Sequence, residues 1–230
     1  MQKFFNFLIF YLLLIPITIV ISLAITLLFF IPTNYKYWLA TRWSHSFIFL
    51  AKNILGLKYE VKGLENLPPA PYVVLCNHQS IWETIFMQVM LPPQSWVLKR
   101  ELLYIPFFGW ALVALQPIAI NRSNRLAAKK ILAKGAIKLA NNRVVLIYPE
   151  GTRVAPGTLK KLQRTGAALA KNSNVPIVPI AHNSGVLWPK GCFLPEAGTI
   201  TVTIGKPIDS LNLDIANINA KVTEFIQAHL

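Results

Sequence analysis

Residues 77–83 hold the side chains whose types and spacing best fit catalysis. They read Asn-His-Gln-Ser-Ile-Trp-Glu and follow a short apolar segment, residues 72–76, that predicts a buried strand. A histidine next to a carboxylate can act as a general base, because imidazoles titrate close to neutral pH and a carboxylate stabilises the protonated ring. His78 and Glu83 are therefore the candidate catalytic residues.

The five-residue spacing between His78 and Glu83 sets a condition on the local structure. On a regular helix, residues five positions apart are rotated by roughly 140°, which separates their side chains. The pair meets only if His78 lies on the turn before the helix. Ser80 and Glu83 match a capping box, which places Ser80 at the N-cap and His78 outside the helix. The same box offers an alternative in which Glu83 only caps Ser80.

A second loop, residues 148–153, reads Tyr-Pro-Glu-Gly-Thr-Arg and also follows an apolar segment that predicts a strand. Gly151 allows the backbone to approach a ligand closely, and Arg153 offers a planar fork for phosphate. Taken alone, this loop is a turn with one exposed arginine. Ligands of open α/β sheets bind at the carboxyl ends of strands, so the two loops together predict a base and an anion clamp on one rim.

Four ordered segments resemble the motifs of glycerolipid acyltransferases. Residues 77–83 resemble the family's His-x4-Asp motif, and residues 148–153 resemble its Phe-Pro-Glu-Gly-Thr-Arg motif. Residues 99–110 and 175–180 match two further motifs in order and spacing, so the similarity spans about residues 58–205. Within the family, the pattern is most similar to that of the bacterial 1-acyl-glycerol-3-phosphate acyltransferases.

The resemblance implies a reaction. His78 would take the proton from the free hydroxyl of lysophosphatidate as that oxygen attacks a fatty acyl thioester, giving phosphatidate, and Glu83 would orient the imidazole. Neither a metal nor a bound cofactor is implied, and the co-substrate is the thioester of acyl-carrier protein or of coenzyme A. The family usually has aspartate where this chain has Glu83, so the hydrogen-bond geometry of the pair is left open.

The resemblance also implies a set of substrate-binding residues, with the acceptor's phosphate held by the second loop. This set comprises Asn77, Ser80, Lys99, Arg100, Glu150, Gly151, Thr152 and Arg153.

Several alternatives stay open. Glycerol-3-phosphate and other lysophospholipids are possible acceptors, because related acyltransferases share these motifs. A hydrolase would deliver the acyl group to water. A non-catalytic membrane-tethered binder of anionic lipid or nucleic acid is disfavoured, because the polar residues cluster at strand ends.

We interpret Cys76 as a core residue and His182 as a hydrogen-bonding residue at a strand end.

The composition predicts one packed domain and an anchor. The chain has 230 residues, 54% of them hydrophobic and 14% charged, and a net charge of +14. Fourteen basic residues lie between positions 99 and 171 against only Glu101 and Glu150, so most of the positive field lies in one third of the chain. Such a field attracts phosphate groups or an anionic bilayer. The two cysteines lack zinc or disulfide spacing, which favours a reducing compartment.

Residues 4–30 predict a membrane segment, because none of the 27 positions is charged. As a helix they would extend about 40 Å, more than the ~30 Å hydrocarbon core of a bilayer. Pro16 leaves open a tilted span or two bent half-helices. Lys3 precedes the segment, whereas Lys36, Arg42 and Lys52 follow it, so we expect the remainder of the chain on the cytoplasmic face of the cell membrane.

Alternating strands and helices follow this segment. Residues 35–55 predict an interfacial helix, or alternatively a core helix, which completes an anchor region of residues 1–57. Strands are expected at 72–76, 95–98, 116–120, 144–148, 176–181 and 199–204, and helices at 81–90, 125–139, 159–171 and 214–228. This alternation predicts an α/β acyltransferase domain over residues 58–230, with a mostly parallel sheet flanked by helices. The basic residues of the 125–139 helix are either a solvated face or a membrane contact.

Overall fold

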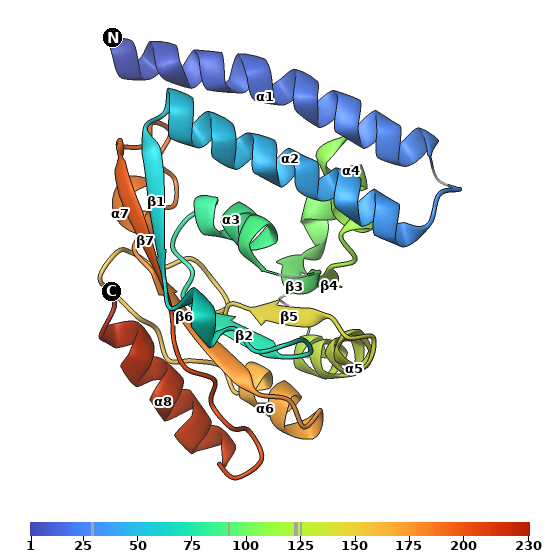
Figure 1. Cartoon of the computed structure of the whole chain (residues 1–230), viewed down its shortest axis with the longest axis vertical. Helices are drawn as coiled ribbons and strands as arrows, with labels where there is room; N and C mark the ends of the chain where they lie inside the picture. The colour runs from blue at the N-terminus through green and yellow to red at the C-terminus, as the bar shows by residue number, and fades with distance from the viewer. Residues whose placement is uncertain (29, 92, 122–123, 125) are drawn as a thin grey trace.

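The computed structural model describes residues 1–28, 30–91, 93–121, 124 and 126–230 (Figure 1). Within them the chain forms a seven-stranded sheet in the order β1-β7-β6-β2-β5-β3-β4. The strands are β1 Leu57–Lys62, β2 Val73–Cys76, β3 Gln94–Lys99, β4 Ile118–Ile120, β5 Val144–Ile147, β6 Ile177–His182 and β7 Gly198–Ile204. All neighbouring strands are parallel except β6 and β7, which confirms the mostly parallel α/β sheet.

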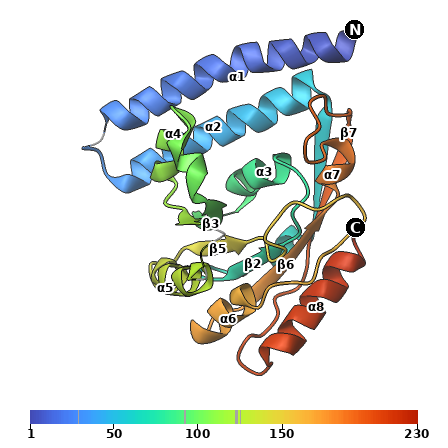
Figure 2. The same ribbon diagram turned by 180° about the vertical axis from the view of Figure 1, so that it is seen from behind.

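Helices cover both faces of the sheet (Figures 1 and 2). The described helices are α1 Gln2–Leu27, α2 Thr33–Ile54, α3 Trp82–Met90, α4 Phe108–Ala114, α5 Ala127–Ala140, α6 Thr165–Asn172, α7 Ser184–Leu187 and α8 Ile215–Gln227. Helices α3 and α4 lie over one face, with α2 and then α1 stacked beyond them, and α5, α6 and α8 cover the other face. The two helical layers therefore lie at opposite ends of the molecule.

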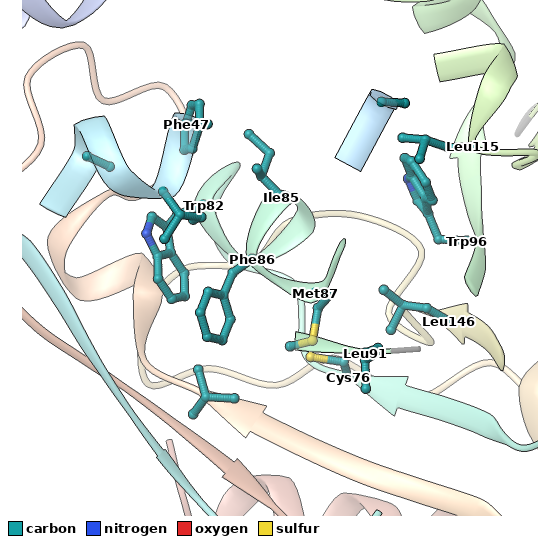
Figure 3. Close-up of a cluster of buried hydrophobic side chains, with 14 of the residues drawn as sticks. Phe47, Cys76, Trp82, Ile85, Phe86, Met87, Leu91, Trp96, Leu115 and Leu146 are labelled. Carbon is teal, nitrogen blue, oxygen red and sulfur yellow. The ribbon is translucent and has the colours of Figure 1, made fainter. Parts of the chain in front are cut away.

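The sheet buries two apolar cores. Every residue of β2 is buried, because both faces of this central strand are covered. Val74 and Cys76 belong to the core under α3 and α4, whereas Val73 and Leu75 belong to the core under α5, α6 and α8. Figure 3 shows the first core, in which side chains of α3 pack close to Cys76. Cys76 is therefore a core residue, as expected.

Helix α1 is continuous through Pro16, so the alternative of two bent half-helices is not observed. At 26 residues it extends about 39 Å. Among the described residues it is the one helix long and apolar enough to cross a membrane, with a mean hydropathy of 2.8 over 18 residues. It folds back along α2, where Phe10 packs edge-on against Phe47 and the Trp43 indole donates a hydrogen bond to the Thr18 hydroxyl at 2.8 Å.

Helix α2 packs into the core on one face, as the core interpretation of residues 35–55 expects, while Trp38 and Phe49 stay exposed and the interfacial interpretation stays a prediction. It lies between α1 and the α/β domain and contacts α3, α4 and β1. Its buried side chains, Phe47 and Ile48 among them, belong to the same apolar core as β2. The boundary at residue 57 stays a prediction, since core packing continues across it.

Four elements differ from the prediction. Strand β1, helix α4 and the short helix α7 were not expected, and α6 begins at Thr165 instead of residue 159. The predicted helix at 125–139 is observed as α5, and Arg125 lies outside the described residues. The remaining predicted strands and helices are confirmed to within three residues at their ends.

Candidate active site

The candidate residues come from three adjacent parallel strands at the centre of the sheet. His78 follows β2, Tyr148 and Glu150 follow β5, and His182 is the last residue of β6. Both β5 and β6 pair with β2 in parallel, so all three carboxyl ends lie at one edge. The prediction that both loops share one rim is confirmed.

His78 and Glu83 form a direct, buried contact. The Nδ1 atom of His78 lies 2.7 Å from Oε1 of Glu83, and the two residues are 6% and 0% exposed. The Ser80 backbone N–H donates to Oε2 of the same carboxylate at 2.9 Å. Glu83 therefore contacts His78 and accepts the Ser80 N–H at the start of α3 at once, so it does more than cap the helix, and its catalytic role stays a prediction. The N-cap itself is Ile81, one residue later than predicted.

Further donors surround the Glu83 carboxylate. The hydroxyl of Ser184, just after β6, donates to Oε2 at 2.8 Å. Burial acts to raise the pKa of Glu83, but the electrostatic effect of His182 and the hydrogen bonds from His78 and Ser184 outweigh it, and the pKa lies below its ordinary value. The site therefore keeps a negative charge beneath His78. Sequence reasoning missed Ser184, although its position at the end of a strand next to β2 could have indicated it.

The loop after β5 holds His78 from three directions. Oε1 of Glu150 accepts the backbone N–H of His78 at 3.2 Å, and the Val154 N–H donates to the His78 carbonyl at 2.8 Å. The Tyr148 ring stacks on the imidazole with centroids 4.2 Å apart and an interplanar angle of 20°. This loop therefore positions the candidate base, a role that its resemblance to a phosphate-binding motif does not indicate.

The Glu150 carboxylate is buried, and only one of its two oxygens accepts a hydrogen bond from the described residues. Its Oε2 atom has no hydrogen-bond partner among the described residues, and burial raises its pKa to about 7 although the His78 N–H lowers it. Gly151, the next residue, has φ +71°, and a Cβ there would lie 2.6 Å from Nε2 of Gln163. The loop thus requires glycine at position 151 both for its conformation and for packing.

A cavity of about 490 Å³ opens beside His78, between the sheet and helices α2, α3 and α4. Its lining includes the cations Lys99 and Arg153 and the neighbouring Thr152, and the guanidinium of Arg153 has no hydrogen bond or ion pair within the described part of the chain. Its wall is otherwise mainly apolar, with contributions from Trp43, Ile85, Trp96, Phe108, Leu112 and Leu115. A cavity that combines cationic side chains with a mainly apolar wall suits an amphiphile that carries an anionic headgroup.

The other predicted substrate-binding residues do not line this cavity. Asn77, Ser80, Glu150 and Gly151 lie beneath or beside it, and Arg100 lies on the surface, with its guanidinium 5.9 Å from the Tyr104 ring centroid. The Asn77 amide is fully used inside the protein, since it bonds the carbonyl and the N–H of His182 at 2.9 and 3.0 Å. Lys190 and Thr18 line the cavity, and the sequence pattern did not indicate either.

Two alternatives for the chemistry can be assessed from burial. Cys76 is fully buried, and burial together with Glu83 and Glu150 raises the pKa of its thiol well above the ordinary value. It is therefore not an activated nucleophile. Burial lowers the pKa of His182, whose ring nitrogens contact the Asn77 carbonyl and the Ser184 hydroxyl, as expected for a residue at a strand end.

Comparison with known proteins places this geometry in context. The sequence model of the family described as Acyltransferase matches residues 58–183. The 1-acyl-sn-glycerol-3-phosphate acyltransferase of Pseudomonas aeruginosa is 48% identical over 186 residues, which cover 78% of this chain and 72% of that protein. The enzyme of the same name from Saccharomyces cerevisiae is 36% identical, covering 76% of this chain and 59% of the yeast protein. This chain therefore spans less than two thirds of the yeast relative's length.

A solved structure shares the fold over the full length of the chain. The 1-acyl-sn-glycerophosphate (LPA) acyltransferase PlsC from Thermotoga maritima superimposes with a TM-score of 0.83 and 21% sequence identity. The match covers 99% of this chain and 95% of the other. The helical hairpin, the sheet and its helical layers thus recur together in a second protein.

Proposed function

Because the chain belongs to the acyltransferase family, we propose that it transfers a fatty acyl group from an acyl thioester to the free hydroxyl of 1-acyl-glycerol-3-phosphate, giving phosphatidate. The observation that carries this proposal is the contact between His78 and Glu83 beside a mainly apolar cavity whose lining includes Lys99 and Arg153. The relatives' names supply the substrate, and the arrangement of the site supplies a mechanism.

His78 is the general base. Its Nδ1 atom is engaged by Glu83, so Nε2 is the nitrogen left to accept a proton. The acceptor oxygen attacks the thioester carbonyl as its proton moves to Nε2. When the tetrahedral intermediate collapses, the C–S bond breaks and the same proton returns to the sulfur, releasing a thiol. Glu83 stabilises the imidazolium throughout without taking the proton.

Arg153 is the main phosphate ligand, with Lys99 and Thr152 next to it on the cavity wall. A guanidinium with no partner in the protein can offer two parallel N–H donors to a phosphate. The phosphate would lie near the cation and the glycerol hydroxyl near His78, which leaves the apolar part of the cavity for a hydrocarbon chain. Glu150 and Gly151 support this arrangement through the backbone, and Arg100 lies farther out.

Helix α1 anchors the enzyme to the cytoplasmic membrane, with the catalytic domain on the cytoplasmic side. The exposed surface of α1 is almost entirely apolar, and Lys36, Arg42 and Lys52 follow it. The acceptor reaches the site from the bilayer, and a soluble thioester of acyl-carrier protein or coenzyme A reaches it from the cytosol.

The test is turnover by the full-length protein in detergent, with a labelled acyl thioester supplied with and without lysophosphatidate. We expect labelled phosphatidate only when the acceptor is present. The variant His78→Ala should lose about 10²- to 10⁴-fold in kcat, the usual contribution of a general base, with an unchanged circular dichroism spectrum. Release of free fatty acid at equal rates with and without acceptor would instead indicate a hydrolase. Faster acylation of glycerol-3-phosphate or another lysophospholipid would reassign the acceptor.

A further inference from the structure

Helix α5 and the segment before α6 carry positive charge that acidic residues of these segments do not balance. Between residues 102 and 195 the sequence has thirteen Lys and Arg residues and a single acid, the buried Glu150. Five exposed members lie on α5 and on the segment before α6, and we call them the basic face: Lys129, Lys134, Lys160, Lys161 and Arg164. None of the five forms a salt bridge within the described residues.

The two parts of the basic face are adjacent in space. Helix α5 packs on α6 so closely that a Cβ at Gly135 would lie 2.5 Å from the Leu169 side chain. Both parts also border a second cavity of about 120 Å³, with Ile131 on the α5 side and Gln163 on the other. The five cations therefore lie on two segments that both border this cavity, although none of the five side chains lines it.

This second cavity adjoins the catalytic one. Val97 and Tyr148 line both cavities, and Tyr148 is the residue whose ring stacks on His78. These two side chains therefore form part of the boundary between the two cavities. A partner held on the basic face would lie beside the second cavity.

The position of the basic face argues against a bilayer as its partner. Helices α5 and α6 cover the sheet face opposite to α1 and α2, and both views show the two layers at opposite ends of the molecule (Figures 1 and 2). A membrane that contacts the apolar surface of α1 therefore leaves α5 directed away from it. Of the two sequence-based interpretations of this basic helix, the structure favours the solvated face over the membrane contact.

We propose that the basic face docks an acidic protein that carries the acyl thioester, an inference that rests on the proposed function. A small phosphorylated ligand needs cations that converge on one point, whereas these side chains are exposed and lie on two separate segments. An extended set of unpaired cations complements an extended acidic surface instead. Contacts of this kind steer encounter and weaken with salt, so they act on KM for the protein-borne donor and not on the chemical step.

The test compares two donors that carry the same acyl chain. The double variants Lys129→Glu/Lys134→Glu and Lys160→Glu/Lys161→Glu are made in the full-length protein, and steady-state rates are measured with acyl-carrier-protein thioester and with coenzyme A thioester. We expect each variant to raise KM for the carrier-protein donor at least tenfold. Both kcat and the coenzyme A kinetics should change less than twofold. The control Lys58→Glu/Lys206→Glu makes the same charge change at exposed sites on other elements and should leave KM for both donors unchanged.

Three outcomes would overturn the proposal. They are an unchanged KM for the carrier-protein donor in both test variants, an equal rise for the two donors, and a loss of binding to anionic vesicles with unchanged donor kinetics. Binding of unacylated carrier protein, measured by fluorescence anisotropy, tests docking independently of turnover and should weaken at least tenfold in the test variants. If the wild-type protein binds the carrier but uses neither donor, the proposed function fails while docking stands.

Discussion

Glu83 contacts both the start of a helix and the proposed base. Its carboxylate accepts the Ser80 N–H at the start of α3 and contacts Nδ1 of His78, while Ser184, the first residue of α7, donates to Oε2. Because the carboxylate is anchored from two elements, its length matters as well as its charge. The glutamate spans the gap to His78 in this chain, where relatives with the family's usual motif have the shorter aspartate.

Replacing Glu83 separates the effect of its charge from the effect of its length. Glu83→Gln removes the charge that stabilises the imidazolium, and we expect kcat to fall about 10²-fold or more. Glu83→Asp keeps the charge but withdraws it by about one C–C bond, and we expect a loss of about tenfold, because the 2.7 Å contact lengthens. Steady-state rates with saturating donor and acceptor measure both losses.

The exposed Glu65 provides the control for these variants. Glu65→Gln should leave kcat unchanged. Full activity of Glu83→Gln would show that the carboxylate only caps the helix.

Glu150 predicts a specific dependence of stability on pH. Burial raises its pKa from an ordinary 4.5 to about 7, so the folded state binds this proton more tightly than the unfolded chain does. The stabilising contribution of Glu150 is therefore complete below pH 4.5 and is lost as the pH rises through about 7. Glu150→Gln cannot ionise and should lack this loss.

Thermal unfolding of both proteins at pH 5 and pH 8 measures this effect. The change in Tm between the two pH values is compared between the wild type and Glu150→Gln, so the contributions of the other titrating groups cancel. We expect Tm of the wild type to fall relative to Glu150→Gln between the two pH values. Parallel changes in Tm would contradict the raised pKa.

The contact between His78 and Glu83 was predictable from sequence, and the residues that support it were not. His78 and Glu83 are close in the chain, and a capping box sets the turn between them, so local rules suffice. Ser184 reaches Glu83 from 101 positions away, and Tyr148 reaches His78 from the neighbouring strand. Such contacts depend on the order of strands in the sheet, which periodicity does not encode.

The loop after β5 offers a test at the level of an element. Gly151 and Gly157 both have positive φ, at +71° and +69°, but only Gly151 has a side chain within 4 Å of the position that a Cβ would take. An alanine at either position strains the backbone by about 1–3 kcal/mol. At Gly151 it also displaces Gln163, whose N–H bonds the Pro149 carbonyl within the same loop.

We therefore expect Gly151→Ala to reduce kcat at least tenfold and Gly157→Ala to leave it nearly unchanged, with similar losses of Tm from backbone strain. Steady-state rates and thermal unfolding of both variants, measured under the same conditions, test this expectation. Equal activities would show that the loop does not position His78.

Each element that sequence reasoning missed or misplaced has its own physical cause. Strand β1 lies at the edge of the sheet and exposes Lys58, Glu60 and Lys62, so it lacks the apolar run that marks the central strands. Helix α4 has only seven residues, too few to show a period. Helix α6 begins late because the preceding segment is held against the loop by Gln163. Strands buried on both faces were predictable because their β-branched runs are continuous.

At the scale of the whole molecule, the apolar hairpin is part of the catalytic architecture. Thr18 of α1 and Trp43 of α2 line the cavity that contains His78, and the two side chains are hydrogen-bonded to each other. The cavity is therefore built by the hairpin and the α/β domain together. The layer that contains the apolar surface of α1 and the layer that carries the basic face lie on opposite sides of the sheet, so the proposed lipid acceptor and the proposed protein-borne donor would approach from opposite sides.

The exposed face of α1 gives the last prediction. Leu12 and Val20 are 71% and 63% exposed, and a carboxylate placed in hydrocarbon costs on the order of 3 kcal/mol. The variant Leu12→Glu/Val20→Glu should therefore weaken binding to lipid vesicles at least tenfold. It should retain activity toward detergent-dispersed lysophosphatidate, because neither residue lines the catalytic cavity.

The control Leu211→Glu alters an exposed leucine in the segment before α8, in the layer opposite α1, and should leave vesicle binding unchanged. Sedimentation with vesicles measures the partition. Equal binding of all three proteins would mean that a surface other than α1 contacts the membrane, and the assignment of α5 to the aqueous side would then lose its support.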